Sequence, residues 1–228
     1  MAQHMTASDE ATEVTATLTC PVTPNWEVYR PPAQCFLGSS TGLHGLGHLA
    51  RVLVWANQLA LHMQEDGIEV DREAVRWAAT LHDVRRIADG PEPEHGTRCS
   101  SWLQNRDFEP LIGVSSNRLA RIAYCCYWHV PRDDMAPSMT PELICLKDAD
   151  ALDRVRLNGP DVRQLRTGFA RQMLGQARFL CDTSRVLQTT LNDPWLAVRT
   201  TATNVGLWST ESPASTLELA HRLRYFIT

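Results

Sequence analysis

The chain has 228 residues, of which 43% are hydrophobic and 21% charged, and its formal net charge is -4. This length and composition are those of a globular protein with one large domain, and they exclude a chain that is disordered throughout. The acidic balance argues against broad electrostatic binding of nucleic acid. The sequence has neither an apolar run of membrane-spanning length nor the apolar core of a secretory signal, so we expect a cytoplasmic protein with no membrane contact.

The cysteines and basic residues add two further constraints. The seven cysteines are odd in number and contain no Cys-x-x-Cys pair. This predicts reduced, mostly buried thiols rather than a disulfide framework or a zinc ribbon. Among the 22 basic residues only Lys147 is a lysine. Arginine suits bidentate contacts with phosphate or carboxylate groups, although a codon bias in the source genome would give the same count.

The N-terminal part of the chain is predicted to be irregular. Residues 1–19 are rich in Thr, Ala, Asp and Glu, and we expect them to be disordered or derived from an expression tag. Prolines interrupt residues 20–43, which we expect to form an extended arm that packs on a single helical domain of residues 44–228. Three aromatic residues are the expected anchors of this arm: Trp26, Tyr29 and Phe36.

Hydrophobic residues recur at helical spacing from His44 onward. The first apolar stripe ends near Met63, and Asp71 is a candidate N-cap of a second helix that reaches His82. A Gly/Pro-containing loop follows this second helix. Helical patterns then cover four further ranges: 95–105, 117–129, 141–157 and 161–180.

The expected helix boundaries complete the fold prediction. Asn117 and Thr140 are candidate caps, and Pro141 suits the first position of the helix after Thr140. Residues 200–216 are polar and loop-like, whereas residues 217–226 suggest a short terminal helix. Strand-like alternation is nearly absent. The sequence therefore predicts an all-α protein, a compact helical bundle with an irregular N-terminal arm.

Histidine and aspartate residues recur on successive predicted helices. His48 lies on the first helix, the doublet His82-Asp83 ends the second, and Asp150 lies on a later one. Divalent metals accept imidazole nitrogen and carboxylate oxygen, and helical bundles build metal sites from neighbouring helices. A single histidine on a helix is more often a surface or hydrogen-bonded core residue, so the prediction of a metal site depends on the order of the set. Because glycines make the start of the first helix irregular, we expect His48 alone to bind the metal, and His44 either to contact one of the metal-binding side chains or to be an end-of-helix group.

The segments around these residues resemble the motifs of the HD superfamily of metal-dependent phosphohydrolases. In chain order, the matching segments are His44–Val52, Leu81–Gly90, Glu94–Ser100, Tyr127–His129 and Asp148–Arg154. The resemblance covers about residues 44–157, roughly half of the chain. It is specific to the superfamily but not to a substrate.

The resemblance implies a metal site and a reaction. It implies four ligands of one divalent transition metal: His48, His82, Asp83 and Asp150. Manganese, iron, cobalt, nickel and zinc are candidates, and magnesium is a further option. His95 and His129 would either hold a second ion, with Asp83 bridging, or contact the substrate and protonate the leaving oxygen; we favour one ion. Metal-bound hydroxide would then attack a phosphate ester of a nucleotide or another small phosphorylated metabolite.

Three arginines and one carboxylate are candidates for supporting roles. Arg51 and Arg86 follow predicted ligands by three or four residues and return to nearly the same helix face, so they are candidate phosphate clamps. Salt bridges with nearby carboxylates are their alternative role. Arg154 is expected to contact the substrate or to pair with Asp150, and Asp153 to support the last ligand.

Several other functions compete with the leading hypothesis. Some members of the same fold are mixed-valent di-iron oxygenases, and this chain can supply their ligand set with His48, His82, Asp83, His95, His129 and Asp150. A nuclease is disfavoured by the acidic charge and the lack of interleaved aromatic and basic residues. An inert metal-binding regulatory module is disfavoured by the complete ligand set. A symmetric homodimer is one assembly open to an enzyme of this size.

Overall fold

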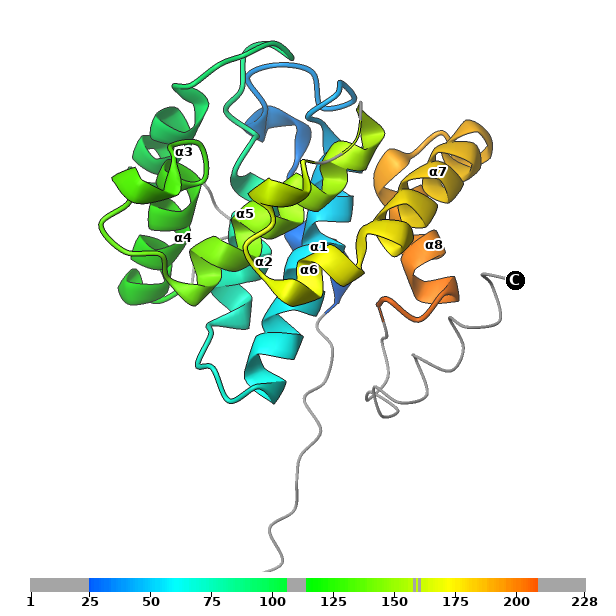
Figure 1. The fold of residues 1–228 in the computed structure, drawn as a ribbon. Helices are drawn as coiled ribbons and strands as arrows, with labels where there is room; N and C mark the ends of the chain where they lie inside the picture. Colours follow the sequence, from blue (N-terminus) through cyan, green and yellow to red (C-terminus); the bar gives the residue numbers. More distant parts are fainter. Residues whose placement is uncertain (1–24, 106–113, 158, 160, 209–228) are drawn as a thin grey trace, which may run out of the picture.

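The computed structural model describes residues 25–105, 114–157, 159 and 161–208. Its helices are α1 (Leu46–Glu65), α2 (Arg72–Leu81), α3 (His95–Gln104), α4 (Ser116–Trp128), α5 (Pro141–Asp153), α6 (Gly168–Gln172), α7 (Leu174–Leu191) and α8 (Pro194–Asn204). Short 3-10 helices are η1 (Trp26–Tyr29), η2 (Ala33–Cys35), η4 (Asp133–Met135), η5 (Arg154–Arg156) and η6 (Val162–Gln164). These described residues contain no strand, so the predicted all-α fold is confirmed (Figure 1).

Helix α1 is the central helix of the bundle. It packs against α2, α5 and α8 (Figure 1). Its completely buried side chains occupy successive positions rather than one stripe: Leu49, Ala50, Val52, Leu53, Val54, Trp55 and Ala56. A helix that is apolar on all sides requires neighbours on all sides. Helices α2 and α5 to α8 therefore pack around α1, whereas α3 packs on α4, and polar side chains at the first turn of α1 lie at the edge of the core.

Two predicted helix starts are confirmed. The Asp71 carboxylate accepts the N–H of Ala74 at 3.1 Å and caps α2. The Thr140 hydroxyl accepts the N–H of Leu143 at 3.3 Å, and Pro141 is the first residue of α5. These are local signals, because a cap and the N–H group that donates to it lie within one turn.

The predicted cap Asn117 is wrong. Helix α4 begins at Ser116, and the hydroxyl of Ser115 accepts the N–H of Arg118 at 3.3 Å. Asn117 lies inside the first turn. Because serine and asparagine are both good caps, the sequence alone does not select among these adjacent positions.

The single helix predicted over residues 161–180 is also wrong. This segment forms η6, then α6, then α7, which continues to Leu191. The Asp148 carboxylate accepts the N–H groups of Arg166 and Thr167 at 2.8 and 2.9 Å. Because a side chain of α5 binds these N–H groups, they are lost to any helical ladder from the preceding residues. The Thr167 hydroxyl instead caps α6.

The C-terminal prediction is wrong for residues 200–204, which belong to α8 rather than to a loop. Asp193 caps this helix by accepting the N–H groups of Trp195 and Leu196 at 3.0 and 3.1 Å, and Pro194 occupies the first position. The Asp-Pro pair is a helix-start signal that the prediction missed. The predicted helix over residues 217–226 lies outside the described residues, as do residues 1–19.

The described part of the N-terminal arm packs by its aromatic side chains. Trp26 is buried, and its ring lies against Trp195 and Trp208, with centroids 5.1 and 4.6 Å apart. Tyr29 is completely buried and donates its hydroxyl hydrogen bond to Glu73 on α2 at 2.8 Å. The third expected anchor, Phe36, is only partly buried against the core.

Two expectations from the sequence concerned buried, reduced thiols and the absence of a membrane-spanning helix. All six cysteines in the described ranges are buried and free of disulfide bonds. None of the described helices combines the length and apolar character needed to cross a membrane.

Candidate metal centre

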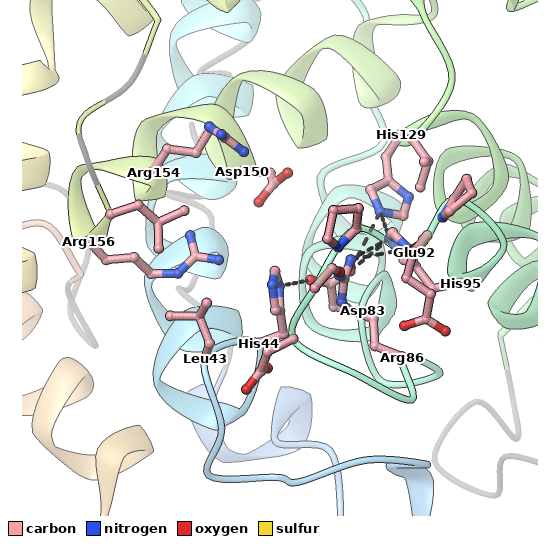
Figure 2. Close-up of a pocket in the computed structure, with 16 residues that line it drawn as sticks. Leu43, His44, Asp83, Arg86, Glu92, His95, His129, Asp150, Arg154 and Arg156 are labelled. Carbon is pink, nitrogen blue, oxygen red and sulfur yellow. Dashed lines mark hydrogen bonds and ion pairs between the residues drawn. The ribbon is translucent and has the colours of Figure 1, made fainter.

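A cavity of about 580 Å³ lies at the end of the bundle where α1 begins and α2 and α5 end (Figure 2). Its wall contains most of the residues singled out in the sequence: His44, Asp83, Arg86, His95, His129, Asp150 and Arg154. His48 and His82 lie behind this wall and are almost completely buried. The fold thus brings residues from five helices, or from positions adjoining them, to one place.

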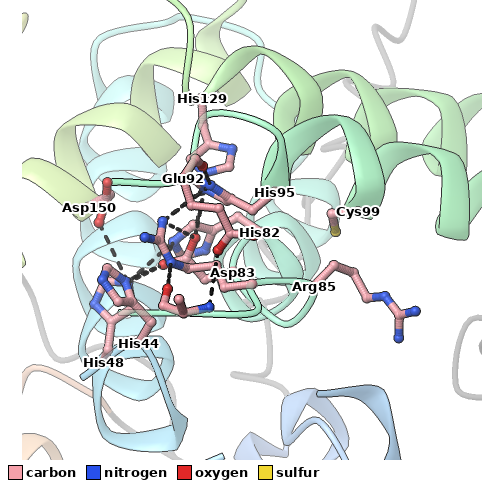
Figure 3. A network of polar contacts seen from close by, with 12 residues as sticks. His44, His48, His82, Asp83, Arg85, Glu92, His95, Cys99, His129 and Asp150 are labelled. Atoms are coloured by element: carbon pink, nitrogen blue, oxygen red, sulfur yellow. Dashed lines mark hydrogen bonds and ion pairs between the residues drawn. The ribbon is translucent and has the colours of Figure 1, made fainter. Parts of the chain in front are cut away.

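Four ligand-type atoms form a first group (Figure 3). Nε2 of His48 lies 3.3 Å from Nε2 of His82 and 3.4 Å from Oδ2 of Asp83. The same nitrogen lies 3.5 Å from Oδ1 of Asp150, and Nε2 of His82 lies 3.6 Å from Oδ2 of Asp83. Ligands held about 2.1 Å from one ion stand about 3.0–3.4 Å from each other. The atoms around Nε2 of His48 are therefore close to ligand spacing. Two overlapping triads could each hold an ion: His48, His82 and Asp150, and His44, His48 and Asp83.

The opposite ring nitrogens show which form these imidazoles take. Nδ1 of His48 faces Oδ2 of Asp153 at 2.8 Å, and Nδ1 of His82 faces the carbonyl of Ala79 at 3.0 Å. A carboxylate or carbonyl oxygen only accepts, so each Nδ1 donates and each neutral ring has a lone pair on Nε2. Two lone pairs at 3.3 Å repel each other unless a cation or proton lies between them. The donor set therefore fits a metal ion.

A second group surrounds the other oxygen of Asp83. The Nε2 atoms of His95 and His129 are 2.9 Å apart and lie 3.0 and 3.7 Å from Oδ1 of Asp83. Their Nδ1 atoms donate to the carbonyls of Glu92 and Cys126. The Nε2 lone pairs again face each other. Asp83 consequently presents one carboxylate oxygen to each group.

Close packing of α3 on α4 brings His95 and His129 together. His95 is the first residue of α3, and His129 directly follows α4. A Cβ atom at Gly96 would lie 2.6 Å from the carbonyl oxygen of Cys126 and 3.0 Å from that of Tyr127. Only glycine permits this approach of the two backbones. The His95-Gly96 pair in the sequence therefore has a geometric reason.

Burial and neighbouring charges set the protonation of the first group. Burial lowers the pKa of His82 from 6.5 to about 3, so its imidazole is neutral at neutral pH. Burial alone would raise the pKa of Asp83, but the surrounding imidazoles hold it well below its ordinary value. The pKa of Asp150 is lowered as well, because His48 and His82 outweigh the effect of burial. Burial and the charge of Arg156 would lower the pKa of His48, but Asp153 and Asp83 raise it overall. A divalent cation requires neutral imidazoles and ionised carboxylates, so it would compete with a proton at His48.

Asp153 supports His48 and engages Arg51. This carboxylate is completely buried and accepts from Nε and Nη2 of Arg51 at 2.5 and 3.1 Å. Burial would raise the pKa of Asp153, but Arg51 and His48 lower it overall. Because Arg51 is buried and binds Asp153 with two donors, the expectation that it clamps a phosphate is not supported. Arg51 instead fixes the carboxylate that orients His48.

Arg86 lines the cavity but directs its donors mainly at the loop after α2. Nη2 donates to the carbonyl of Gly90 at 2.6 Å, and Nε to that of Ala88 at 3.3 Å. Nη1 lies 3.8 Å from Oδ1 of Asp83 and 3.2 Å from Nδ1 of His95. Arg86 therefore holds this loop over the second group, and its guanidinium is less available as a phosphate clamp than expected.

Two more predicted residues adjoin the first group. Nδ1 of His44 lies 2.7 Å from Oδ2 of Asp83, so His44 contacts a ligand residue. Helix α5 ends at Asp153 rather than at residue 157, and Arg154 lies on η5 with an exposed side chain on the cavity wall. Arg156, two residues further, also lines the cavity, although the sequence reasoning missed it. The sequence feature that could have pointed to Arg156 is the run Arg154-Val155-Arg156, which places two arginines close behind Asp153.

The loop after His129 is bound to α5 by the single lysine of the chain. Nζ of Lys147 donates to the carbonyl of Pro131 at 2.5 Å and to Oδ1 of Asp133 at 2.8 Å. The side chain of Arg166 pairs with the same Asp133 carboxylate at 2.8 Å. Burial lowers the pKa of Lys147. These contacts fix the chain on the C-terminal side of His129.

Comparison with known proteins agrees with this geometry. Residues 45–155 match the family model described as HD domain. The match includes both groups of ligand-type residues. No curated protein and no solved structure matches the chain.

Proposed function

Residues 45–155 belong to the HD superfamily of metal-dependent phosphohydrolases, and on this basis we propose that the protein hydrolyses a phosphate ester of a nucleotide or another small phosphorylated metabolite. The family consists mostly of metal-dependent hydrolases. One observation carries the proposal: Nε2 of His48 and Nε2 of His82 face each other beside carboxylate oxygens of Asp83 and Asp150 at the cavity. A cavity of about 580 Å³ is in the range of small-molecule sites.

We assign two positions for divalent ions. The first has four ligands: His48, His82, Asp83 and Asp150. The second would use Oδ1 of Asp83 with His95 and His129, and their opposed lone pairs support it. This differs from the single ion that the sequence favoured. Manganese, iron, cobalt, nickel and zinc all suit such nitrogen and oxygen donors.

The residues around the ions have separate tasks. A bound divalent ion supplies a water of lowered pKa and charge that polarises a phosphoryl group. Asp83 connects the two ligand groups, and Asp153 holds His48 in the orientation that turns Nε2 toward the first position. Arg86 keeps the 88–90 loop closed over His95. With both Nε2 atoms engaged at the second position, His95 and His129 act as ligands rather than as proton donors.

Phosphate release tests the proposal directly. Metal-stripped protein is supplied separately with manganese, cobalt, nickel, iron and magnesium, and assayed on a panel of nucleotides and sugar phosphates. We expect metal-dependent release that disappears in Asp83→Ala and persists in Asp134→Ala, a change at an exposed aspartate outside the cavity. Absence of release from folded, metal-loaded protein would contradict the proposal. Two bound irons with oxygen uptake would then identify the oxygenase alternative, which no observation favours at present.

The homodimer and the cytoplasmic location stay predictions. Sedimentation of the purified protein tests the first, and fractionation of the source cells tests the second.

A further inference from the structure

Arg156 is a buried arginine whose guanidinium is only partly used by the protein. Its exposed fraction is 7%. Nη1 donates to the backbone carbonyl of Asp153 at 3.1 Å and lies 3.2 Å from Oδ2 of the same residue. Nε is buried and has no hydrogen-bond partner among the described residues. Among the described residues, only Nη1 of this guanidinium has a partner within hydrogen-bond distance, so its remaining N–H groups are open to a further acceptor.

The carboxylate that Arg156 contacts is shared with a second arginine. Asp153 is its nearest carboxylate, but Arg51 already binds both oxygens of Asp153 at 2.5 and 3.1 Å. Two buried guanidinium groups therefore share one carboxylate. Both Arg156 and Asp150 line the cavity, and Figure 2 shows the guanidinium of Arg156 directed toward the space between His44 and Asp150.

Arg154 adds a second cation at the same end of the cavity. It lies on η5 with Arg156, is exposed, and forms no ion pair with any described residue. Arg86, the third arginine on the wall, donates instead to the carbonyls of its own loop. Free guanidinium donors therefore gather at η5, on the side of the cavity where Asp150 lies (Figure 2).

We propose that Arg156 and Arg154 form an anion subsite that binds the terminal phosphate of a phosphomonoester. This inference depends on the proposed function and adds the class of substrate. A phosphoryl group bound there needs one oxygen for the adjacent ion position and one acceptor for each guanidinium. A phosphomonoester has three such non-bridging oxygens, whereas a diester has two. Arginine is suited to this contact because its planar fork of donors matches phosphate oxygens.

Phosphate binding provides a test that does not depend on turnover. Inorganic phosphate is titrated calorimetrically into metal-free and manganese-loaded protein. We expect Arg156→Met to weaken phosphate binding by roughly tenfold or more, since it removes charge-assisted hydrogen bonds. Arg154→Met should weaken it less. Arg163→Met is the matched control, because Arg163 is exposed and pairs with Asp161. Because Arg156 also contacts Asp153, manganese content is measured in each variant and phosphate affinity is compared at equal metal loading.

Kinetics separate this inference from the proposed function. With p-nitrophenyl phosphate, Arg156→Met should raise KM, and the wild type should prefer this monoester to bis(p-nitrophenyl) phosphate. Unchanged phosphate binding in Arg156→Met, or a preference for the diester, would overturn the subsite while leaving hydrolysis intact. Phosphate binding that requires Arg156 in a protein without hydrolytic activity would support the subsite and contradict the hydrolase.

A conservative variant covers the case in which Arg156→Met does not fold. Arg156→Lys keeps the buried charge but loses the planar fork, so it should fold and still bind phosphate severalfold more weakly than the wild type. Wild-type affinity in Arg156→Lys together with wild-type affinity in Arg154→Met would overturn the proposal.

Discussion

Two buried regions of the molecule are built on opposite principles. In the cluster of Trp26, Trp195 and Trp208, the rings pack against one another and each indole N–H lacks a hydrogen-bond partner among the described residues. Apolar contact dominates there. In the cavity cluster, the imidazoles and carboxylates are held by outer hydrogen bonds, yet lone pairs face each other at 2.9 and 3.3 Å.

This difference indicates that the tryptophan cluster contributes mainly to stability and the cavity cluster mainly to ligand binding. Burial of large aromatic side chains stabilises the folded chain even when an N–H is left without a partner. Opposed lone pairs gain nothing unless a ligand joins them, so the cavity cluster is organised for binding at the expense of the metal-free fold. Substitutions in the two regions should therefore separate loss of activity from loss of stability.

The largest effect on activity is expected for Asp83→Ala. This change removes the carboxylate shared by both ligand groups, and the loss of charge stabilisation should lower turnover roughly a thousandfold or more. The metal-free protein should also lose the stability that the ionised Asp83 contributes through its low pKa and its contact with His44. Metal analysis, kinetics and urea denaturation measure these quantities, with Asp134→Ala as the control. Full metal content with full activity would refute the assignment of Asp83.

The largest effect on stability is expected for Trp195→Ala. Truncation of this completely buried ring should reduce the free energy of unfolding by about 3–5 kcal/mol. The metal content of the remaining folded protein should equal that of the wild type, as judged by denaturation curves and elemental analysis. Loss of metal from the folded variant would show that the two regions are coupled.

Gly96→Ala tests the contact between α3 and α4. A Cβ atom 2.6 Å from the carbonyl of Cys126 forces the helices apart, which should cost about 1–3 kcal/mol and displace His95 from His129. The second ion should be lost before the first, as measured by metal titration. Gly175→Ala is the matched control, since nothing lies within 4 Å of its Cβ position in α7. Equal behaviour of the two variants would contradict this account of Gly96.

Asp153→Asn tests the support of His48. The change keeps the shape of the side chain but weakens the hydrogen bond to Nδ1 of His48 and leaves Arg51 without its carboxylate. We expect metal affinity to fall about 10–100-fold, as for other supporting groups of metal-bound histidines. Asp161→Asn, at the surface, is the control. Unaltered metal affinity in Asp153→Asn would make the Arg51–Asp153 pair purely structural.

The smallest effect concerns acid stability. The pKa of Asp153 is lowered in the folded protein, so below about pH 4 the unfolded chain binds a proton that the folded chain does not. The metal-free wild type should thus lose about 1 kcal/mol per pH unit through this group as the pH falls. Asp153→Asn should flatten the profile, whereas Trp195→Ala should only displace it. Parallel profiles for wild type and Asp153→Asn would disprove this contribution.

The residues that meet at the cavity could be predicted because they lie in short motifs in a fixed order. His48, the His82-Asp83 doublet and Asp150 are recognisable from their immediate neighbours. The partner of Arg51 was not recognisable, since it lies 102 residues away in the sequence. Because Arg51 donates to Asp153, it supports the carboxylate beside His48 instead of binding a phosphate, as its position on the helix had suggested.

The helix boundaries show the same pattern: those set by neighbouring residues could be predicted, and those set by a distant residue could not. Asp71 and Thr140 act within one turn of their helices, and both were predicted correctly. The interruption at Arg166 and Thr167 was missed because its cause is Asp148, at a distance of 18 residues for Arg166. No periodicity within the segment itself indicates a side chain from another helix.

Because Lys147 is the only lysine of the chain and is held by the loop after His129, its reaction with amine reagents can report on the opening of that loop. Its Nζ, which is held by Pro131 and Asp133, is the one side-chain amine of the chain. An amine-reactive reagent can reach it only after the loop following His129 separates from α5. The rate at which the peptide containing Lys147 is acylated in folded protein therefore measures the opening of that loop, and slower acylation with metal or phosphate bound would reveal that occupancy keeps it closed.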